Sequence, residues 1–475
     1  MRMNFSFAFK ALFTALCTGT LALSTWTTSA SASSANFDGW VESQAVTSKE
    51  RMYRNISPAG AVPGTILASP SKENPNYYYY WVRDGALVMQ SILGLYEEQK
   101  SLESLTTLMQ FVTYSRDNQA KAAHNLGEPR FNVDGTVNTE PWGRPQNDGP
   151  ALRALVLTRF AQNLLAKGDR AYVERELYSA KIPADTVIKT DLEYVAHHWR
   201  EKCIDLWEEI WGQHFFTRAV QLAALKEGAK LANRMNDPGA ANFYLVQAKA
   251  LESELMKHWS ESRGHYLATL DSDAGPDHQK PTELDTSVIL AALAVEQSTG
   301  PLSITDGRIL ATAEKLEQTF SVLYGVNRDT SVGTAIGRYS EDYYFGGNPW
   351  VLTTAAFAEL HYKLAARLQT ARTFVLDREQ ARFFSRLKDG VSIRAGVDLA
   401  DANNESLREF IIASLKEKAD GFMKRIRLHV NEDGSFSEQY HRDTGFMISA
   451  YDLTWSYASF LRASSAKREF DQLRR

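Results

Sequence analysis

Two acidic segments, far apart in the sequence, contain the residue types that acid–base catalysis requires. Residues 205–209 read DLWEE, and residues 437–440 read SEQY. A general acid and a general base are often two carboxyl groups whose surroundings push their pKa values apart. The indole of Trp207 would keep the carboxyl of Glu208 partly dry and raise its pKa towards working pH. Glu208 is therefore the predicted acid.

Three other carboxylates compete for the second role. Glu209 follows Glu208 directly, so its side chain is expected to point elsewhere. If residues 205–209 form the first turn of a helix, Asp205 lies on the same face as Glu208, about 5–6 Å away between Cβ atoms. That leaves little room for an attacking water, so Asp205 is predicted to support Glu208, although it stays open as the formal proton acceptor. Glu438 follows turn residues and is expected in a loop, where catalytic groups often sit.

Aromatic residues make up 11% of the chain, and several stand beside charged residues. Residues 77–84 read YYYYWVRD, which places Arg83 and Asp84 directly after an aromatic run. Carbohydrate sites favour this mixture, because rings stack on the apolar face of a sugar while charged groups bind its hydroxyls. A structural ion pair would explain Arg83 and Asp84 equally well.

These segments occur in the order found in the glucoamylases of glycoside hydrolase family 15, which the chain resembles from about residue 55 to residue 461. The matching segments are residues 77–84, 128–134, 142–150, 205–209, 337–342, 348–350 and 437–440. The resemblance implies an all-α fold, an (α/α)6 barrel, with long loops that form the active-site cleft at one end.

The resemblance also implies a role for individual residues. Glu208 matches the general acid, and Glu438 matches the general base, with Ser449 hydrogen-bonded to it. Arg83 and Asp84 match the pair that grips the terminal glucose. The other residues implied to bind substrate are Tyr77, which stacks near the reacting ring, Trp142, which contacts the acid, Glu209, which binds the leaving sugar, Arg338, which binds sugar hydroxyls, and Trp81, Trp207, Asp342, Tyr344 and Trp350.

Helical periodicity dominates the chain and predicts about a dozen helices. They are expected at residues 87–96, 105–114, 151–165, 186–199, 215–231, 241–259, 286–295, 308–320, 350–368, 378–387, 407–430 and 453–461. Strand-like pieces are short, at 264–269 and 434–437. Asp148 and Asn348 each precede a proline closely and are expected to cap helices. No repeat of constant length indicates a solenoid, and no linker divides the chain.

The first 32 residues are predicted to be a signal peptide, with a basic flank, an apolar stretch and cleavage after Ala32. Residues 33–475 would then form one catalytic domain without a starch-binding domain, secreted or periplasmic and expected to be a monomer. Removal of Cys17 would leave Cys203 as a lone, buried cysteine. The net charge of −4 gives no electrostatic case for nucleic acid, and no segment predicts a membrane anchor. No metal or cofactor motif is present.

The resemblance therefore implies an inverting, exo-acting α-glucosidase. It would release β-D-glucose from the non-reducing ends of starch, dextrins and malto-oligosaccharides, cleaving α-1,4 linkages and, more slowly, α-1,6 linkages. Two alternatives stay open: a related enzyme with another linkage preference, such as a glucodextranase or trehalase, and a non-catalytic glucan-binding protein.

Overall fold

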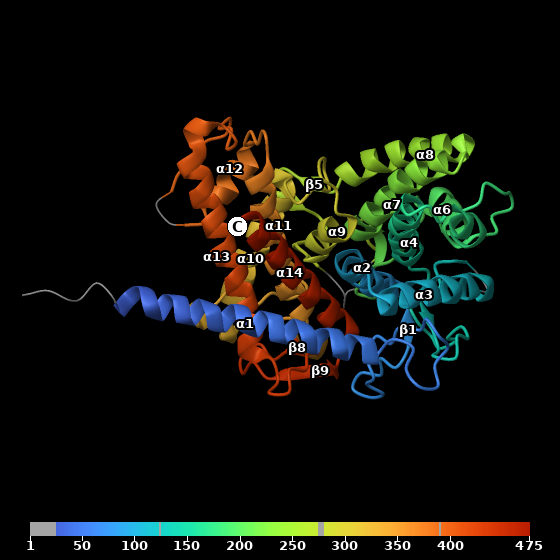
Figure 1. Cartoon of the computed structure of the whole chain (residues 1–475), viewed down its shortest axis with the longest axis horizontal. Helices are drawn as coiled ribbons and strands as arrows, with labels where there is room; N and C mark the ends of the chain where they lie inside the picture. Colours follow the sequence, from blue (N-terminus) through green and yellow to red (C-terminus); the bar gives the residue numbers. More distant parts are fainter. Residues whose placement is uncertain (1–24, 123–124, 274–279, 389–390) are drawn as a thin grey trace, which may run out of the picture.

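The computed structural model describes residues 25–475 apart from residues 123–124, 274–279 and 389–390. Helices form most of it, and the strands are short pairs in the connections (Figure 1). No helix in the described part of the chain is long and apolar enough to cross a membrane.

A closed ring of mutually packed helices forms the centre of the fold. In order around the ring they are α2 (Val82–Gln99), α4 (Asp148–Ala166), α7 (Phe215–Arg234), α9 (Ser287–Val295), α11 (Val351–Thr370) and α14 (Thr454–Leu473). Each packs on the next, and α14 packs back on α2. All nine residues of α9 are buried, as expected for a helix with neighbours on every side.

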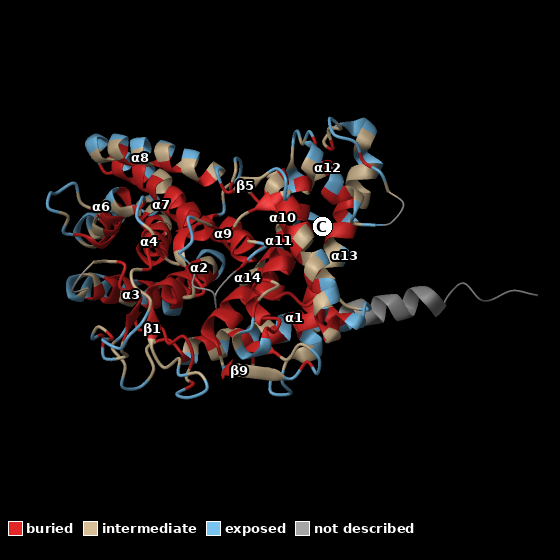
Figure 2. Cartoon of the chain, turned by 180° about the vertical axis from the view of Figure 1, so that it is seen from behind, coloured by how far each residue is buried: buried red, intermediate tan, exposed pale blue. Residues whose placement is uncertain are grey.

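A second layer of helices covers this ring. Each outer helix packs on the ring helix next to it in sequence, except the first, which packs on the last ring helix. These outer helices are α3 (Leu102–Lys121), α6 (Val187–His198), α8 (Pro238–Met256), α10 (Gly307–Leu323), α13 (Glu405–His429) and α1 (Thr25–Arg54), which lies along α14. Figure 2 shows buried residues concentrated in the central layer and exposed residues on the outer helices. The fold is therefore the (α/α)6 barrel that the sequence predicted.

The remaining elements lie in the connections. They are α5 (Arg170–Tyr172), η1 (Val173–Leu177), η3 (Gly325–Arg328), η4 (Tyr344–Gly346), α12 (Arg378–Ser385) and η5 (Ala402–Asn404). The antiparallel strand pairs are β1 (Tyr80–Trp81) with β2 (Arg130–Phe131), β3 (Cys203–Ile204) with β4 (Trp211–His214), β4 with β7 (Thr269–Leu270), β5 (Trp259–Ser260) with β6 (His265–Tyr266), and β8 (Ser437–Tyr440) with β9 (Met447–Tyr451).

Every predicted helix overlaps a helix of the structure, but α1 was not predicted. Its buried face runs through Phe37, Val41, Gln44, Ser48 and Met52. The polar members interrupt the apolar pattern that periodicity relies on, and the amide of Gln44 donates to Ser48 Oγ at 3.3 Å. The predicted cleavage point after Ala32 falls within this helix, and residues 1–24 lie outside the described residues, so the signal peptide stays a prediction.

Two predicted helix caps are wrong. α4 begins at Asp148 itself, whose carboxylate accepts from Arg83 at 3.1 Å instead of capping the helix. α11 begins at Val351, and the side chain of Asn348 instead bonds to the connection that precedes the helix and to Gln439. Both residues are used for tertiary contacts, which local capping rules do not anticipate. Cys203 is buried, as predicted.

Candidate active site

One cavity of about 610 Å³ opens at the end of the barrel where the ring helices begin. Arg83 and Asp84 of α2, Trp350 before α11 and Trp455 of α14 all line it. The ring helices therefore run in parallel, with their N-termini towards the cavity. Aligned helix dipoles make that end of the barrel electrically positive, which favours the charged form of carboxylates placed there.

The segment 205–210 is a tight loop and not the helix turn considered from the sequence. Asp205 Oδ1 accepts from the backbone N–H groups of Glu209 and Ile210 at 2.7 and 2.9 Å. The carbonyl of Asp205 accepts from Glu208 N at 3.0 Å. Glu208 sits at a φ of 67°, in the left-handed region that non-glycine residues seldom occupy. The carboxylate of Asp205 therefore stabilises the turn that presents Glu208, and Asp205 does not line the cavity.

Glu208 reaches into the cavity, where three donors converge on its Oε1. Trp81 Nε1 donates at 2.8 Å, Gln146 Nε2 at 2.9 Å and Arg83 Nη2 at 3.4 Å. Among the described residues none donates to Oε2. This oxygen is the one placed to exchange a proton with a ligand, while the other fixes the orientation of the carboxyl.

Glu438 lines the same cavity from strand β8, more than two hundred residues further along the chain. Its Oε2 accepts from Ser449 Oγ at 2.5 Å and from Gln439 Nε2 at 2.9 Å. Burial raises the pKa of Glu438 to about 7, although the bond from Ser449 and the charge of Arg338 act in the opposite direction. The structure thus brings together the two carboxyl groups that the sequence singled out.

Arg83 and Asp84 project from the first turn of α2. Arg83 Nη1 donates to Gln146 Oε1 at 2.8 Å and to Asp148 Oδ2 at 3.1 Å. Its Nε has no hydrogen-bond partner in the described protein, since Asp84 Oδ2 is 3.7 Å away. Burial raises the pKa of Asp84 to about 6, and the negative charges of Glu208 and Asp148 add to this. The pair is thus both structural and available to a ligand.

Arg338 lines another part of the cavity wall and fixes two acidic side chains there. Its guanidinium makes two hydrogen bonds to Asp342, at 2.8 and 2.6 Å, and an ion pair with Glu209 at 2.7 Å. Tyr339 OH donates to the other oxygen of Glu209 at 2.7 Å. Burial raises the pKa of Glu209, against the charges of Arg338 and Lys280. Glu209 therefore faces the cavity as a fixed acceptor, and Asp342 holds Arg338 from behind.

Aromatic rings complete the walls. Tyr77 and Tyr344 share a hydrogen bond between their hydroxyls at 2.8 Å. Trp81 and Trp142 lie edge to face with centroids 6.1 Å apart, and the guanidinium of Arg130 lies 3.9 Å from the Trp142 ring. Trp350 Nε1 is buried and has no hydrogen-bond partner in the described protein. Flat apolar faces and unpaired donors are what a sugar ring requires.

Comparison with known proteins agrees with this geometry. Residues 46–465 match the sequence profile described as Glycosyl hydrolases family 15. The chain belongs to glycosyl hydrolase family 15.

Similar family 15 proteins cover most of the chain. A glucoamylase of Blastobotrys adeninivorans is 37% identical over 90% of this chain and 71% of its own length. A solved glucoamylase structure from Saccharomycopsis fibuligera superposes with a TM-score of 0.81 at 30% identity, covering 92% of this chain and 96% of that one. A family 15 glucoamylase structure from Hypocrea jecorina gives 0.81 at 29% identity, covering 91% and 72%.

Most of the residues predicted for this family 15 site line the cavity. They are Tyr77, Trp81, Arg83, Asp84, Trp142, Trp207, Glu208, Glu209, Arg338, Tyr344, Trp350 and Glu438. Asp205, Asp342 and Ser449 lie one layer behind, each bonded to a lining residue or its loop.

Sequence analysis assigned no part in the site to several residues that the structure places there. Gln146 and Asp148 contact Arg83, and Arg130 lies on Trp142. Lys280 and Asp285 form a buried ion pair beneath the loop of Glu208. The first two stand within a matching segment and could have been named from it, whereas nothing around Lys280 and Asp285 in sequence marks them. Among the described residues, no group of three or more His, Cys, Asp or Glu side chains is arranged to hold a metal ion.

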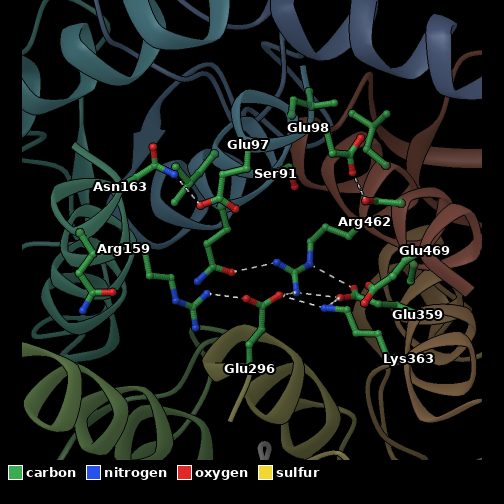
Figure 3. A pocket seen from close by; sticks show the side chains of 18 residues that line it. Ser91, Glu97, Glu98, Arg159, Asn163, Glu296, Glu359, Lys363, Arg462 and Glu469 are labelled. Carbon is green, nitrogen blue, oxygen red and sulfur yellow. Dashed lines mark hydrogen bonds and ion pairs between the residues drawn. The ribbon is translucent and has the colours of Figure 1, made fainter. Parts of the chain in front are cut away.

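A second cavity, of about 580 Å³, lies at the other end of the barrel. Glu97 and Glu98 from the end of α2 line it, together with the ion-paired residues Arg159, Glu296, Glu359, Lys363 and Arg462, here called the rear cluster (Figure 3). Arg462 bonds to both Glu296 and Glu359, and so does Lys363. The charges of the rear cluster therefore satisfy one another.

Proposed function

We propose that the protein is an exo-acting, inverting glucan 1,4-α-glucosidase. It releases β-D-glucose from the non-reducing ends of starch, dextrins and malto-oligosaccharides, and cleaves α-1,6 linkages more slowly. Support comes from its family and from relatives named glucoamylases. The main support is that Glu208 and Glu438, which lie far apart in the sequence, line the same cavity.

The assignment of acid and base follows from the direction in which the substrate enters. In an exo-acting enzyme the terminal glucose fills the closed end of the pocket, and the leaving chain extends towards solvent. The acid, which protonates the leaving oxygen, must stand nearer the mouth. The Glu208 side chain is 18% exposed, whereas Glu438 is 1% exposed. Glu208 is thus the proposed acid and Glu438 the proposed base.

The surroundings of Glu438 impose a condition on this assignment. The raised pKa of Glu438 favours its protonated form below about pH 7, yet a base must be ionised. The hydrogen bonds from Ser449 and Gln439 favour the carboxylate. We propose that the reaction proceeds through the molecules in which Glu438 is already ionised, a fraction that falls as the pH drops below about 7.

In the proposed reaction, Glu208 Oε2 protonates the glycosidic oxygen while Glu438 takes a proton from a water molecule. That water attacks the anomeric carbon from the side opposite to the leaving group, which inverts the configuration. The two carboxyl groups then need a separation of about 6.5–9.5 Å. Arg83 and Asp84 would bind hydroxyls of the terminal glucose, and Arg338 and Glu209 those of the leaving sugar.

We further propose that the chain works as one secreted or periplasmic catalytic domain, residues 33–475, after removal of residues 1–32, and that it is monomeric. Its substrates are α-glucans and malto-oligosaccharides, and it needs no cofactor. Asp205 takes the supporting role, because both of its oxygens are engaged by the backbone and by Lys280.

Proton NMR of the product formed from maltotriose tests the proposal directly. We expect β-D-glucose to appear first, before it equilibrates with the α form. Initial α-D-glucose would reject inversion, and no glucose at all would favour a binding protein. Parallel turnover measurements with isomaltose and trehalose separate the glucodextranase and trehalase alternatives, since either substrate should be poorer than maltose.

A further inference from the structure

Lys280 is a buried lysine directly beneath the proposed catalytic loop. Its ammonium group lies 3.3 Å from Asp205 Oδ2, 3.2 Å from Asp285 Oδ2 and 3.7 Å from Glu209 Oε2. It also lies 3.9 Å from the centre of the Tyr339 ring. A lysine stays charged in such a place because three carboxylates offset the cost of burial.

Two partners of Lys280 hold the residues that come directly before and after Glu208 in the sequence. Asp205 binds the backbone N–H groups of Glu209 and Ile210, which close the loop immediately after Glu208. Asp285 accepts from the indole of Trp207, the residue before Glu208, at 3.0 and 3.1 Å. The ammonium group of Lys280 therefore links Asp205, which binds the backbone after Glu208, to Asp285, which binds the side chain before it.

The backbone of Glu208 needs such support. A left-handed conformation is unfavourable for a glutamate and persists only where surrounding contacts impose it. Without the ammonium group, Asp205, Asp285 and Glu209 would face one another as buried like charges, which repel. Asp205 and Asp285 could then be satisfied only by moving or by taking up a proton, and either change loosens the loop.

We propose that Lys280 is a positioning residue for the general acid, acting on Glu208 through Asp205 and Asp285. It contacts neither Glu208 nor the cavity walls other than Glu209. Its effect is on the placement of the acid, so it influences protonation of the leaving group more than binding of the terminal glucose. This inference depends on the proposed function, because it assumes that Glu208 protonates a leaving group.

The test compares two substrates that differ in their need for an acid. Maltose has a poor leaving group that must be protonated, whereas α-D-glucosyl fluoride has a leaving group that departs with little help. We expect Lys280→Met to lower kcat for maltose about 10- to 100-fold, no more than the low end of the roughly 10²–10⁴-fold that a general acid contributes because the acid is displaced and not removed, and kcat for the fluoride less than about threefold. The inhibition constant of glucose should stay within about twofold of wild type.

Lys363→Met is the matched control, because Lys363 is also a lysine paired with two carboxylates, although its side chain is 23% exposed, and it lies in the rear cluster. It should lower Tm and leave both turnover numbers unchanged. Equal losses on maltose and fluoride in Lys280→Met would overturn the inference, since general damage to the site acts on both substrates. Wild-type enzyme without activity on maltose would instead overturn the proposed function.

Asp285→Asn provides a second route if Lys280→Met does not fold. The amide keeps an oxygen for Trp207 and the N–H of Ser287 but loses the charge that binds Lys280. The same selective loss on maltose is expected, smaller in size. Lys280→Arg, which keeps the charge, should recover most of the turnover on maltose. A fully active Asp285→Asn variant together with an inactive Lys280→Arg variant would contradict the proposal.

Discussion

Both ends of the barrel gather charged side chains around a cavity, but they use them differently. At the rear, two charged side chains and a neutral amide also cap a helix: Arg462 donates to Leu293 O, Arg159 to Val295 O and Gln90 to Ala294 O. These are the last carbonyls of α9, which have no partner within a helix that ends there. No nitrogen of Arg159, Lys363 or Arg462 is left buried without a partner.

At the front, several buried groups have fewer partners than they could bind. Arg83 Nε, Asp148 Oδ1 and Trp350 Nε1 have no hydrogen-bond partner in the described protein. The carboxylate of Glu208 accepts hydrogen bonds at only one of its two oxygens among the described residues, and burial raises the pKa of Glu438 far above its usual range. Buried polar groups are normally satisfied, so three exceptions around one cavity fit the proposal that this end binds a ligand. The described lining of the rear cavity has one such atom, Asn163 Oδ1, and the charges of the rear cluster pair with one another.

The largest expected effect at the front comes from the two carboxyl groups themselves. Glu208→Gln and Glu438→Gln should each lower kcat on maltotriose by about 10²–10⁴-fold, because each removes a proton-transfer step. Binding of dextrin should persist in both. Steady-state kinetics, with calorimetry for binding, measures the two separately.

The fluoride substrate then distinguishes the roles. Glu208→Gln should hydrolyse α-D-glucosyl fluoride at a rate close to wild type, whereas Glu438→Gln should fail on both substrates because water still has to be deprotonated. The reverse pattern would exchange the roles of acid and base. Near-normal turnover of maltotriose by either variant would remove that residue from catalysis.

At the rear, the expected effect is on stability. Glu359→Ala should cost about 1.5–3 kcal/mol of unfolding free energy, because it removes the charge-assisted hydrogen bonds between a buried carboxylate and the half-buried Arg462 and Lys363. The kcat on maltotriose should be unchanged at a temperature where the variant is folded. Thermal unfolding gives the first quantity, and a lower kcat in the fully folded variant would show that the two ends are coupled.

The pH dependence of this stability loss has a definite sign. Burial alone would raise the pKa of Glu359, but Arg462 and Lys363 together hold it below its usual value. A depressed pKa in the folded state contributes stability above the unfolded pKa of about 4.3 and loses it as the pH falls. The difference in Tm between Glu359→Ala and wild type should therefore be largest near neutral pH and shrink below about pH 4. A difference that grows on acidification would contradict the ion-pair explanation.

The contrast between the two ends also explains what the sequence could predict. Helix positions came from apolar periodicity, which the ring helices must have because they are buried on several sides. α1 was missed because its inner face includes Gln44 and Ser48. The residues proposed to bind substrate stand in segments that match the family's own, so Glu208 and Arg83 could be named.

Residues that act only through tertiary contacts do not stand in a recognisable sequence motif. Lys280 and Asp285 look like ordinary surface charges in the sequence, and only the fold brings them under Trp207. The same is true of Arg462, which meets Glu296 from a segment more than 150 residues away. The left-handed backbone of Glu208 also depends on Asp205 being part of a loop, and the helical interpretation of residues 205–209 excluded that geometry.

An intermediate effect is expected from substitution of Arg83, which bonds to neighbouring side chains and also lines the cavity where the substrate is proposed to bind. Arg83→Lys keeps a positive charge but loses the planar fork that reaches Gln146 and Asp148 together. We expect kcat/KM for maltose to fall about 10- to 100-fold, equivalent to one or two charge-assisted hydrogen bonds. Wild-type kcat/KM in this variant would show that Arg83 is only a structural ion-pair partner, like the arginines at the rear.

The smallest expected effect is a shift in a pH profile. Because burial raises the pKa of Glu438 to about 7, kcat/KM should fall with one proton as the pH drops below that value in the free enzyme. Ser449→Ala removes a hydrogen bond that lowers this pKa, so the acidic limb should move to higher pH and the loss should be greatest in acid. Ser465→Ala, at a serine of the rear cavity that bonds to Glu98, is the matched control and should leave the limb in place. An unmoved limb in Ser449→Ala would mean that another group, with Asp84 the nearest candidate at a pKa of about 6, controls the acidic side.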